Sequence, residues 1–140
     1  MTQLESRELA AELTQAIGGL VLQNDEYRSD PWDGLSIVVT LVPGRQNVTG
    51  YIYDGDSWTS RTPRGDDSFL DKCIELQEAM RSPKGEVWKQ ALIHITKPGP
   101  EINIKFEYDD PKRWSLKKVS LDMSDYAESL RPPRKDAAVE

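Results

Sequence analysis

The sequence has very little of the residue types on which much enzyme chemistry depends. Among 140 residues there is one cysteine, Cys73, and one histidine, His94. One cysteine cannot form an internal disulfide, and the pair cannot supply the ligands of a Cys/His zinc site. The single histidine also excludes most nucleophiles that need a histidine base, apart from forms that use lysine or a carboxylate. We therefore expect no enzymatic activity, no cofactor and no bound metal.

Long apolar stretches are missing as well. The longest, "LSIVVTLV" at Leu35 to Val42, has eight residues, whereas a membrane-spanning helix needs about 20. The first residues, "MTQLESRELAAELTQ", lack the basic patch and the apolar run of a signal peptide. Together with the single cysteine, these absences predict a cytoplasmic protein that has no membrane partner.

Basic residues are fewer than acidic residues. The chain has 18 Lys and Arg residues against 24 Asp and Glu residues, for a net charge of −6, which argues against direct binding to nucleic acid. Residues 1 to 80 contain 14 acidic residues and 6 basic ones, whereas residues 81 to 100 contain 1 acidic and 4 basic. No glycine-rich loop joins a strand to a helix, so nothing indicates a nucleotide phosphate site.

The first half of the chain shows one helical pattern and then three strand patterns. Apolar residues at three- and four-residue steps predict a helix that starts near Leu4 and ends at Gly18 and Gly19, or frays beyond them. The β-branched run at Leu35–Val42 predicts a buried strand. Two more strands, at 48–53 and 57–62, are joined by an Asp-Gly pair, which is favoured in tight hairpin turns.

The second half repeats this alternation of helix and strands. Residues 68–80 have a helical period, and Ser68 with Asp71 resembles a capping box. Two strands follow, at 87–96 and 101–108, and then a short helix at 121–130. The second of these strands alternates, with Ile102, Ile104, Phe106 and Tyr108 on a predicted buried face and Glu101, Asn103, Lys105 and Glu107 on a predicted solvent face.

Short connections force neighbouring strands to run antiparallel, which fixes the fold class. We predict an α+β fold in the order α-β-β-β-α-β-β-α, in which helices pack on an antiparallel sheet of about five strands. Residues 1–132 are expected to form a single domain, since the chain has no interior linker or repeat. Residues 133–140 are expected to form a flexible C-terminal tail.

The stretch "FEYDDPKRW" places two carboxylates, Asp109 and Asp110, next to each other. Adjacent strand residues point to opposite faces, so these carboxylates converge only if the chain turns, as Pro111 suggests. A working acid/base pair also needs burial that separates the two pKa values, and an exposed turn does not provide it. A structural turn or a partner contact is therefore favoured over catalysis or metal binding.

A second acidic motif, "DGDSW", contains Asp54 and Asp56 and resembles the start of a calcium loop. The twelfth position of such a loop is Gly65 and not the required glutamate, so a hairpin turn is the better interpretation. Trp58 follows directly, and other tryptophans also lie near acidic residues. These aromatic residues either fill the core or serve as anchors of an interface rimmed by carboxylates. Cys73 lies on an apolar helical stripe, which favours a buried, inert thiol.

With these elements in order, the chain resembles the YezG-like immunity proteins, which accompany bacterial polymorphic toxins, including those delivered by contact-dependent inhibition. The resemblance covers about residues 4 to 132. It rests on the order of elements and on the segments "YIYDGDSW", "FLDKCIELQEAM", "GEVWKQALIHIT" and "FEYDDPKRW", with the closing "LRP".

The resemblance implies a protein without catalytic activity that binds the C-terminal toxic domain of a cognate toxin, commonly a nuclease, and blocks it. Carboxylates would then occupy the basic cleft that a nuclease presents to phosphates. The expected partner-binding residues are Asp54, Asp56, Trp58, Asp66, Asp67, Asp109 and Asp110. For the last two a structural role in the turn is the alternative, in which Arg113 pairs with one of them and Trp114 closes the core.

Two other functions remain open at this point. One is a small cytoplasmic α+β enzyme or ligand-binding domain, which would have a concave apolar pocket between sheet and helices. The other is an adaptor or secretion chaperone, which would share the acidic surface but bind an unfolded partner.

Overall fold

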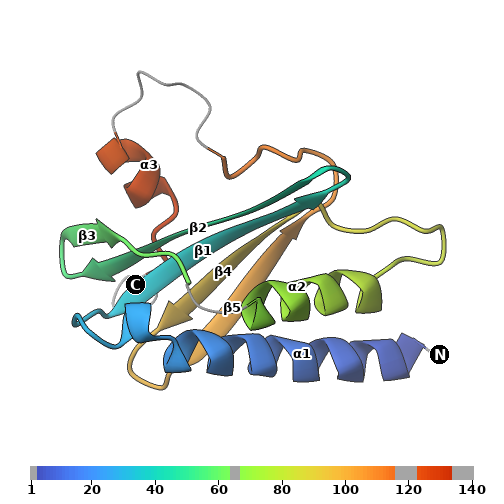
Figure 1. The fold of residues 1–140 in the computed structure, drawn as a ribbon, viewed down its shortest axis with the longest axis horizontal. Helices are drawn as coiled ribbons and strands as arrows, with labels where there is room; N and C mark the ends of the chain where they lie inside the picture. Colours follow the sequence, from blue (N-terminus) through green and yellow to red (C-terminus); the bar gives the residue numbers. More distant parts are fainter. Residues whose placement is uncertain (1–2, 64–66, 116–122, 134–140) are drawn as a thin grey trace.

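The computed structural model describes residues 3–63, 67–115 and 123–133. It confirms the α+β fold and the predicted order of elements. These are α1 (Gln3–Gln23), a single 3-10 turn η1 (Asp25–Tyr27), β1 (Gly34–Val42), β2 (Arg45–Asp54), β3 (Ser57–Ser60), α2 (Ser68–Ala79), β4 (Gln90–Thr96), β5 (Glu101–Glu107) and α3 (Met123–Ser129). The strands form one antiparallel sheet in the order β3-β2-β1-β4-β5 (Figure 1).

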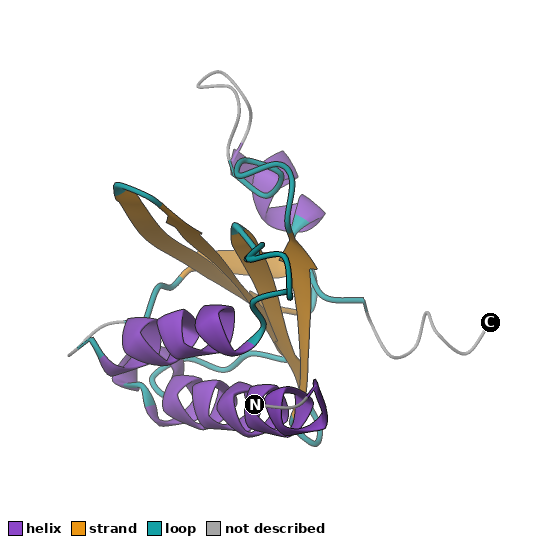
Figure 2. Ribbon diagram, turned by 90° about the vertical axis from the view of Figure 1, so that its right-hand side faces the viewer, coloured by secondary structure: helices purple, strands orange, loops and turns teal. Residues whose placement is uncertain are grey.

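Strand β1 is the centre of the sheet because it pairs with β2 on one side and with β4 on the other. Its residues from Gly34 to Leu41 are all buried, as expected for a β-branched strand that is covered on both faces. Helices α1 and α2 lie side by side on one face of the sheet, and α3 lies on the other (Figures 1 and 2). The protein thus has a helical layer, a sheet and a partial third layer.

The main core lies between the sheet and the α1–α2 layer. It contains Ile17 and Val21 of α1, Cys73 and Leu76 of α2, and inward residues of β1 and β4. The predicted apolar face of β5 also packs here, although Ile102, Ile104, Phe106 and Tyr108 are only partly buried because β5 is an edge strand. Glu101, Asn103 and Lys105 are exposed, which confirms the predicted orientation of the strand, whereas Glu107 at the end of the same face is largely buried.

The predicted end of the first helix at Gly18 and Gly19 is wrong, since α1 continues to Gln23. Gly18 is buried against β5, and a Cβ atom added there would lie 1.9 Å from Cδ1 of Ile102. The glycine therefore permits a close approach of helix and strand. Tertiary packing of the apolar stripe, which runs on through Val21, outweighs the low helix propensity of two glycines.

A smaller core lies on the opposite face of the sheet. Tyr51 and Tyr53 of β2 pack there with Tyr126, Ala127 and Leu130 of the α3 segment. The Tyr53 hydroxyl donates a hydrogen bond to the Ala127 carbonyl at 2.6 Å. These contacts attach α3 to the sheet, and they bring the residues that follow it close to the end of β2.

Local details differ from the predictions at several element ends. Strand β2 begins at Arg45, three residues before the predicted start at 48, because the β1–β2 turn needs only Pro43 and Gly44. Strand β3 ends at Ser60 and not at the predicted residue 62. The predicted capping box is wrong, because Asp67 and not Ser68 is the N-cap of α2. The Asp67 side chain makes no cap hydrogen bond, and the Asp67 carbonyl accepts the Asp71 N–H at 2.8 Å. The start of the third predicted helix and the predicted tail at 134–140 lie outside the described residues. Within the described residues, no helix is both long enough and apolar enough to cross a bilayer.

Candidate functional site

The turn between β2 and β3 displays two of the predicted site residues, Asp54 and Asp56. Between them Gly55 has a φ of +59°, a left-handed conformation that favours glycine. The Gly55 N–H donates to Oδ2 of Asp33 at 2.9 Å, and the Gly55 carbonyl accepts from Nη1 of Arg131 at 2.8 Å. The turn is therefore held at both its amide and its carbonyl by residues that are distant in the sequence.

Arg131 is itself fixed in place by three interactions. Its guanidinium pairs with both carboxylate oxygens of Glu128, each at 2.7 Å, and lies over the ring of Tyr53 at 4.6 Å from the centroid. Bidentate pairing of this kind restricts the orientation of the planar guanidinium. Asp54 and Asp56 are both exposed, and within the described residues the Asp54 carboxylate has no hydrogen-bond or ion-pair partner. The hairpin thus presents negative charge on a backbone that is already ordered.

Trp58 lies in β3 and is half-buried instead of standing free at the turn. Its ring contacts Tyr51 edge to face, at 5.6 Å between centroids, as part of the smaller core beneath α3. Only part of the indole is open to a partner. A structural contribution of Trp58 is therefore present whether or not it is also an anchor.

The other predicted acidic residues of the first half are separate from this turn. Asp66 lies outside the described residues. Asp67 is exposed at the start of α2, and within the described part of the chain no hydrogen bond or ion pair links it to Asp54 or Asp56. The structure therefore does not bring Asp67 into direct contact with the hairpin.

The segment "FEYDDPKRW" forms a turn that is organised around Glu107. One oxygen of this carboxylate accepts the N–H groups of Asp109 and Asp110 at 3.0 and 3.1 Å, and the other accepts Nη1 of Arg113 at 2.8 Å. These bonds lower the pKa of Glu107 from 4.5 to about 2, with Arg113 as the largest cause. The expectation that Arg113 pairs with Asp109 or Asp110 is wrong, because the Glu107 carboxylate takes this place.

The remaining contacts of this segment lie within the turn or join it to β4 and α3. Asp110 accepts the Lys112 N–H at 2.9 Å, so it does cap the turn. The backbone N–H of Trp114 donates to the side-chain oxygen of Gln90, and the backbone carbonyl of Trp114 accepts the Tyr126 hydroxyl at 2.6 Å. Trp114 is partly buried against the smaller core, which agrees with the structural alternative for this residue.

The two acidic turns lie at opposite ends of the sheet. The β2–β3 turn adjoins the end where Tyr53, Gly34, Thr96 and Glu101 stand in register, whereas Asp109 and Asp110 follow Glu107 at the other end. Glu101 and Glu107 are separated by about 20 Å, at about 3.3 Å for each strand residue. The two turns are therefore distinct surface features.

Cys73 and His94 are both buried and have structural surroundings. Burial raises the pKa of the Cys73 thiol to about 12, so the nucleophilic thiolate is not populated near neutral pH. Burial also lowers the pKa of His94, whose Nε2 lies 2.8 Å from the Leu130 carbonyl. Among residues 3–63, 67–115 and 123–133, no group of three or more His, Cys, Asp or Glu side chains could hold a metal ion.

Sequence reasoning missed Asp33, Glu107 and Arg131, which hold the two turns. The contact of Asp33 with Gly55 spans 22 residues and that of Arg131 spans 76, so no local pattern indicates them. Glu107 could have been identified, because a glutamate just before an Asp-Asp-Pro turn can accept the N–H groups of that turn. One described hollow, of about 550 Å³, is lined by residues of α1, of α2 and of the segment after α2, with no sheet residue in its described lining. A second, of about 300 Å³, lies between residues of β1, β2 and α2, as a pocket between sheet and helices would.

Compared with models of known protein families and with the sequences of curated proteins, the chain matches none of them.

Proposed function

We propose that this protein is an immunity protein that binds the C-terminal toxic domain of a cognate toxin and blocks it without catalysis. The observation that carries the proposal is the β2–β3 turn, in which exposed Asp54 and Asp56 flank a glycine held by Asp33 and Arg131. The resemblance of this segment and of "FEYDDPKRW" to YezG-like immunity proteins supports the same function.

A nuclease is the toxin class that best fits this turn. Its active-site cleft must be basic in order to bind phosphates, so a projecting pair of carboxylates can occupy the cleft and exclude the substrate. The net charge of −6 would also accelerate encounter with a basic partner. Because the turn is ordered before binding, little conformational entropy is lost on association.

The proposal assigns the primary contact to the hairpin and not to Asp109 and Asp110. The latter segment already has an internal role, since Glu107 and Asp110 accept its backbone N–H groups. It also lies at the far end of the sheet from the hairpin. The proposal places the protein in the cytoplasm, where a toxin that cleaves nucleic acid would act.

The test is co-expression with the toxin domain encoded by the adjacent upstream gene. We expect the two proteins to co-purify and the cells to survive, and we expect survival to fall when Asp54 and Asp56 are both changed to asparagine. Changing Glu8 and Glu12 to glutamine is the matched control, because it removes the same charge from exposed positions on α1. If the wild-type protein neither binds nor rescues, the proposed function is wrong.

A further inference from the structure

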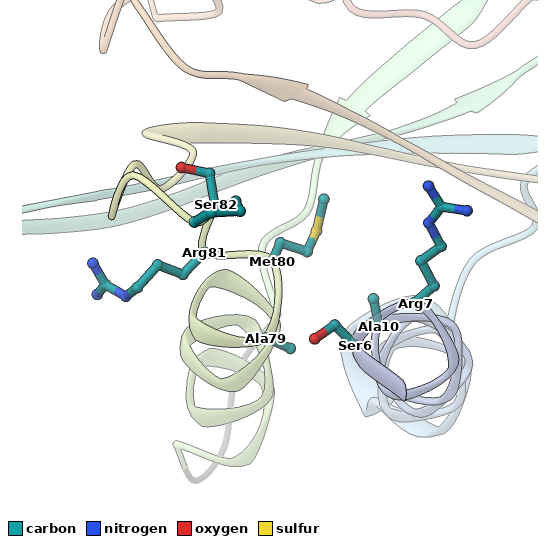
Figure 3. Close-up of a pocket in the computed structure, with 8 residues that line it drawn as sticks. Ser6, Arg7, Ala10, Ala79, Met80, Arg81 and Ser82 are labelled. Atoms are coloured by element: carbon teal, nitrogen blue, oxygen red, sulfur yellow. The ribbon is translucent and has the colours of Figure 1, made fainter. Parts of the chain in front are cut away.

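The hollow of about 550 Å³ lies between the start of α1 and the end of α2 (Figure 3). Ser6, Arg7 and Ala10 line it from α1, and Ala79, Met80, Arg81, Ser82 and Pro83 line it from the end of α2 and the segment that follows. Both charged residues in this described lining are arginines. The described lining thus contains two arginines and no acidic residue, on a protein of net charge −6.

The hollow exists because the residues that face each other here are small. Ser6, Ala10 and Ala79 lie between the two helices and leave space that larger side chains would fill in a protein interior. Arg7 and Met80 extend to the same side of this gap, whereas Arg81 points away from it (Figure 3). The walls are therefore mainly apolar, with one cation beside them.

The two arginines differ in their availability. Arg81 pairs with both carboxylate oxygens of Glu78, at 2.9 and 2.8 Å, and donates to the Gly85 carbonyl. Arg7 is exposed, and it has no hydrogen-bond or ion-pair partner among the described residues. Arg81 is thus a fixed, largely neutralised part of the wall, and Arg7 is the cation available to a ligand.

A second hollow of about 300 Å³ shares Arg81 with the first and extends toward the β1–β2 turn. Its lining includes Ile74, which is 37% exposed, and Val42. Leu4, which is 66% exposed, lies one helical turn before Arg7. Leu4 and Ile74 are the only large apolar side chains in the described residues that are exposed.

We propose that this α1–α2 hollow binds an acidic segment of a partner protein, with an aliphatic side chain in the gap and a carboxylate on Arg7. The charge of Arg7 selects the acidic group, and the apolar wall of Ala10, Ala79 and Met80 selects the aliphatic group. An isolated inorganic anion fits less well, because it would gain only one free cation and leave the apolar wall uncovered. The two adjoining hollows favour an extended chain over a compact small molecule.

This site is independent of the proposed nuclease contact and has the opposite charge preference. The hairpin offers carboxylates to a basic cleft, whereas the hollow offers a cation and apolar surface to an acidic segment. The failure of either proposal would therefore leave the other standing.

The experiment titrates the full chain, labelled with ¹⁵N, with three capped hexapeptides that alternate leucine with glutamate, glutamine or lysine. Binding is followed by amide chemical shifts. We expect the glutamate peptide to bind weakly, with a Kd of about 1 mM or lower, and to shift the amides of Ala10, Met80 and Ser82. We expect the glutamine peptide to bind at least fivefold more weakly and the lysine peptide to cause no shifts at these residues.

Three variants locate the site. Arg7→Gln should weaken binding of the glutamate peptide at least fivefold, and Arg7→Lys should restore most of it. Arg28→Gln removes the same charge from an exposed residue beyond the far end of α1, about 30 Å away, and should leave binding unchanged. Ser6→Phe should block the gap from the exposed first turns of α1 while the other amide shifts remain native.

The proposal is overturned if the glutamate peptide causes no shifts in the hollow at several times the expected Kd. It is equally overturned if the three peptides bind alike, or if Arg7→Gln and Arg28→Gln have the same effect.

Discussion

The Glu107 carboxylate and the Arg113 guanidinium form an ion pair at 2.8 Å across the turn that follows β5. The Glu107 side chain is only 13% exposed, and it also accepts two backbone N–H groups of the turn. We predict that Glu107→Gln lowers the melting temperature at pH 7, because the neutral amide cannot replace three charge-assisted bonds. Asp109→Asn should have little effect, since within the described residues the Asp109 side chain has no partner.

The same pair predicts a pH dependence of stability. The folded state lowers the pKa of Glu107 from 4.5 to about 2, so its contribution is fully present above pH 4.5 and is lost as the pH falls toward 2. The difference in melting temperature between wild type and Glu107→Gln should therefore shrink over this range. Both proteins contain His94, whose own titration cancels in the comparison. A difference that stays constant from pH 7 to pH 2 would contradict the assigned role.

The contact of Gly18 with Ile102 predicts opposite effects for two adjacent glycines of α1. A Cβ at Gly19 would meet nothing within 4 Å, so Gly19→Ala should stabilise the fold by about 1 kcal/mol through helix propensity. A valine at position 18 would press against Ile102, so Gly18→Val should lower the free energy of unfolding by about 1 to 3 kcal/mol. Urea unfolding of each variant measures the two free energies.

A double variant separates the effect of the contact between residue 18 and Ile102 from the effect of helix propensity. Ile102→Val removes the Cδ1 atom that lies 1.9 Å from the added Cβ. Gly18→Ala should therefore be more favourable in the Ile102→Val background than in wild type. Additive effects of the two substitutions would show that the close approach of helix and strand does not constrain residue 18.

The alternation in β5 predicts which substitutions the strand tolerates. Ile104 packs against the main core, so Ile104→Asp should destabilise the protein by about 3 kcal/mol or more and largely unfold it. Asn103→Asp introduces the same side chain on the exposed face and should change stability by less than about 0.5 kcal/mol. Circular dichroism during thermal unfolding distinguishes the two. Similar melting temperatures for both variants would mean that the faces are assigned wrongly.

Sequence patterns predicted the fold because each one reflects a local requirement: burial of one face in β5, burial of both faces in β1, and positive φ in the Asp-Gly turn. The alternation in β5, the apolar run in β1 and the Asp-Gly turn all give the correct element and orientation. The end of α1 was mispredicted because helix propensity is local, whereas the contact of Gly18 with Ile102 is tertiary.

The candidate site was predictable only in part, for a related reason. The sequence Asp54-Gly55-Asp56 is enough by itself to predict a hairpin turn with exposed aspartates. The groups that order this turn, Asp33 and Arg131, come from segments that meet only after the sheet and α3 are assembled. The α1–α2 hollow was not predicted either, because small residues leave a gap only when two helices pack with those residues opposed.

The final prediction concerns toxin binding by the acidic residues of the first half. Replacing Asp54, Asp56, Asp66 and Asp67 by asparagine should leave the melting temperature nearly unchanged, since the described ones are exposed. Binding should weaken by about 2 kcal/mol or more if the carboxylates are desolvated in the complex, or the on-rate should fall if they lie at its rim. Surface plasmon resonance with the toxin domain measures both quantities.

The salt dependence and a narrower variant show whether the hairpin itself is responsible. Added salt screens exposed charges over about 10 Å at 0.1 M, so wild-type association should slow as salt rises, and the fourfold variant should respond less. Asp54→Asn with Asp56→Asn should account for most of the effect, because these two residues share the ordered turn and Asp67 does not contact it. Asp109→Asn with Asp110→Asn, which also removes two charges, should leave affinity almost unaltered. If the fourfold variant binds with unchanged rate and affinity, the acidic residues serve only solubility, and the toxin must contact another surface.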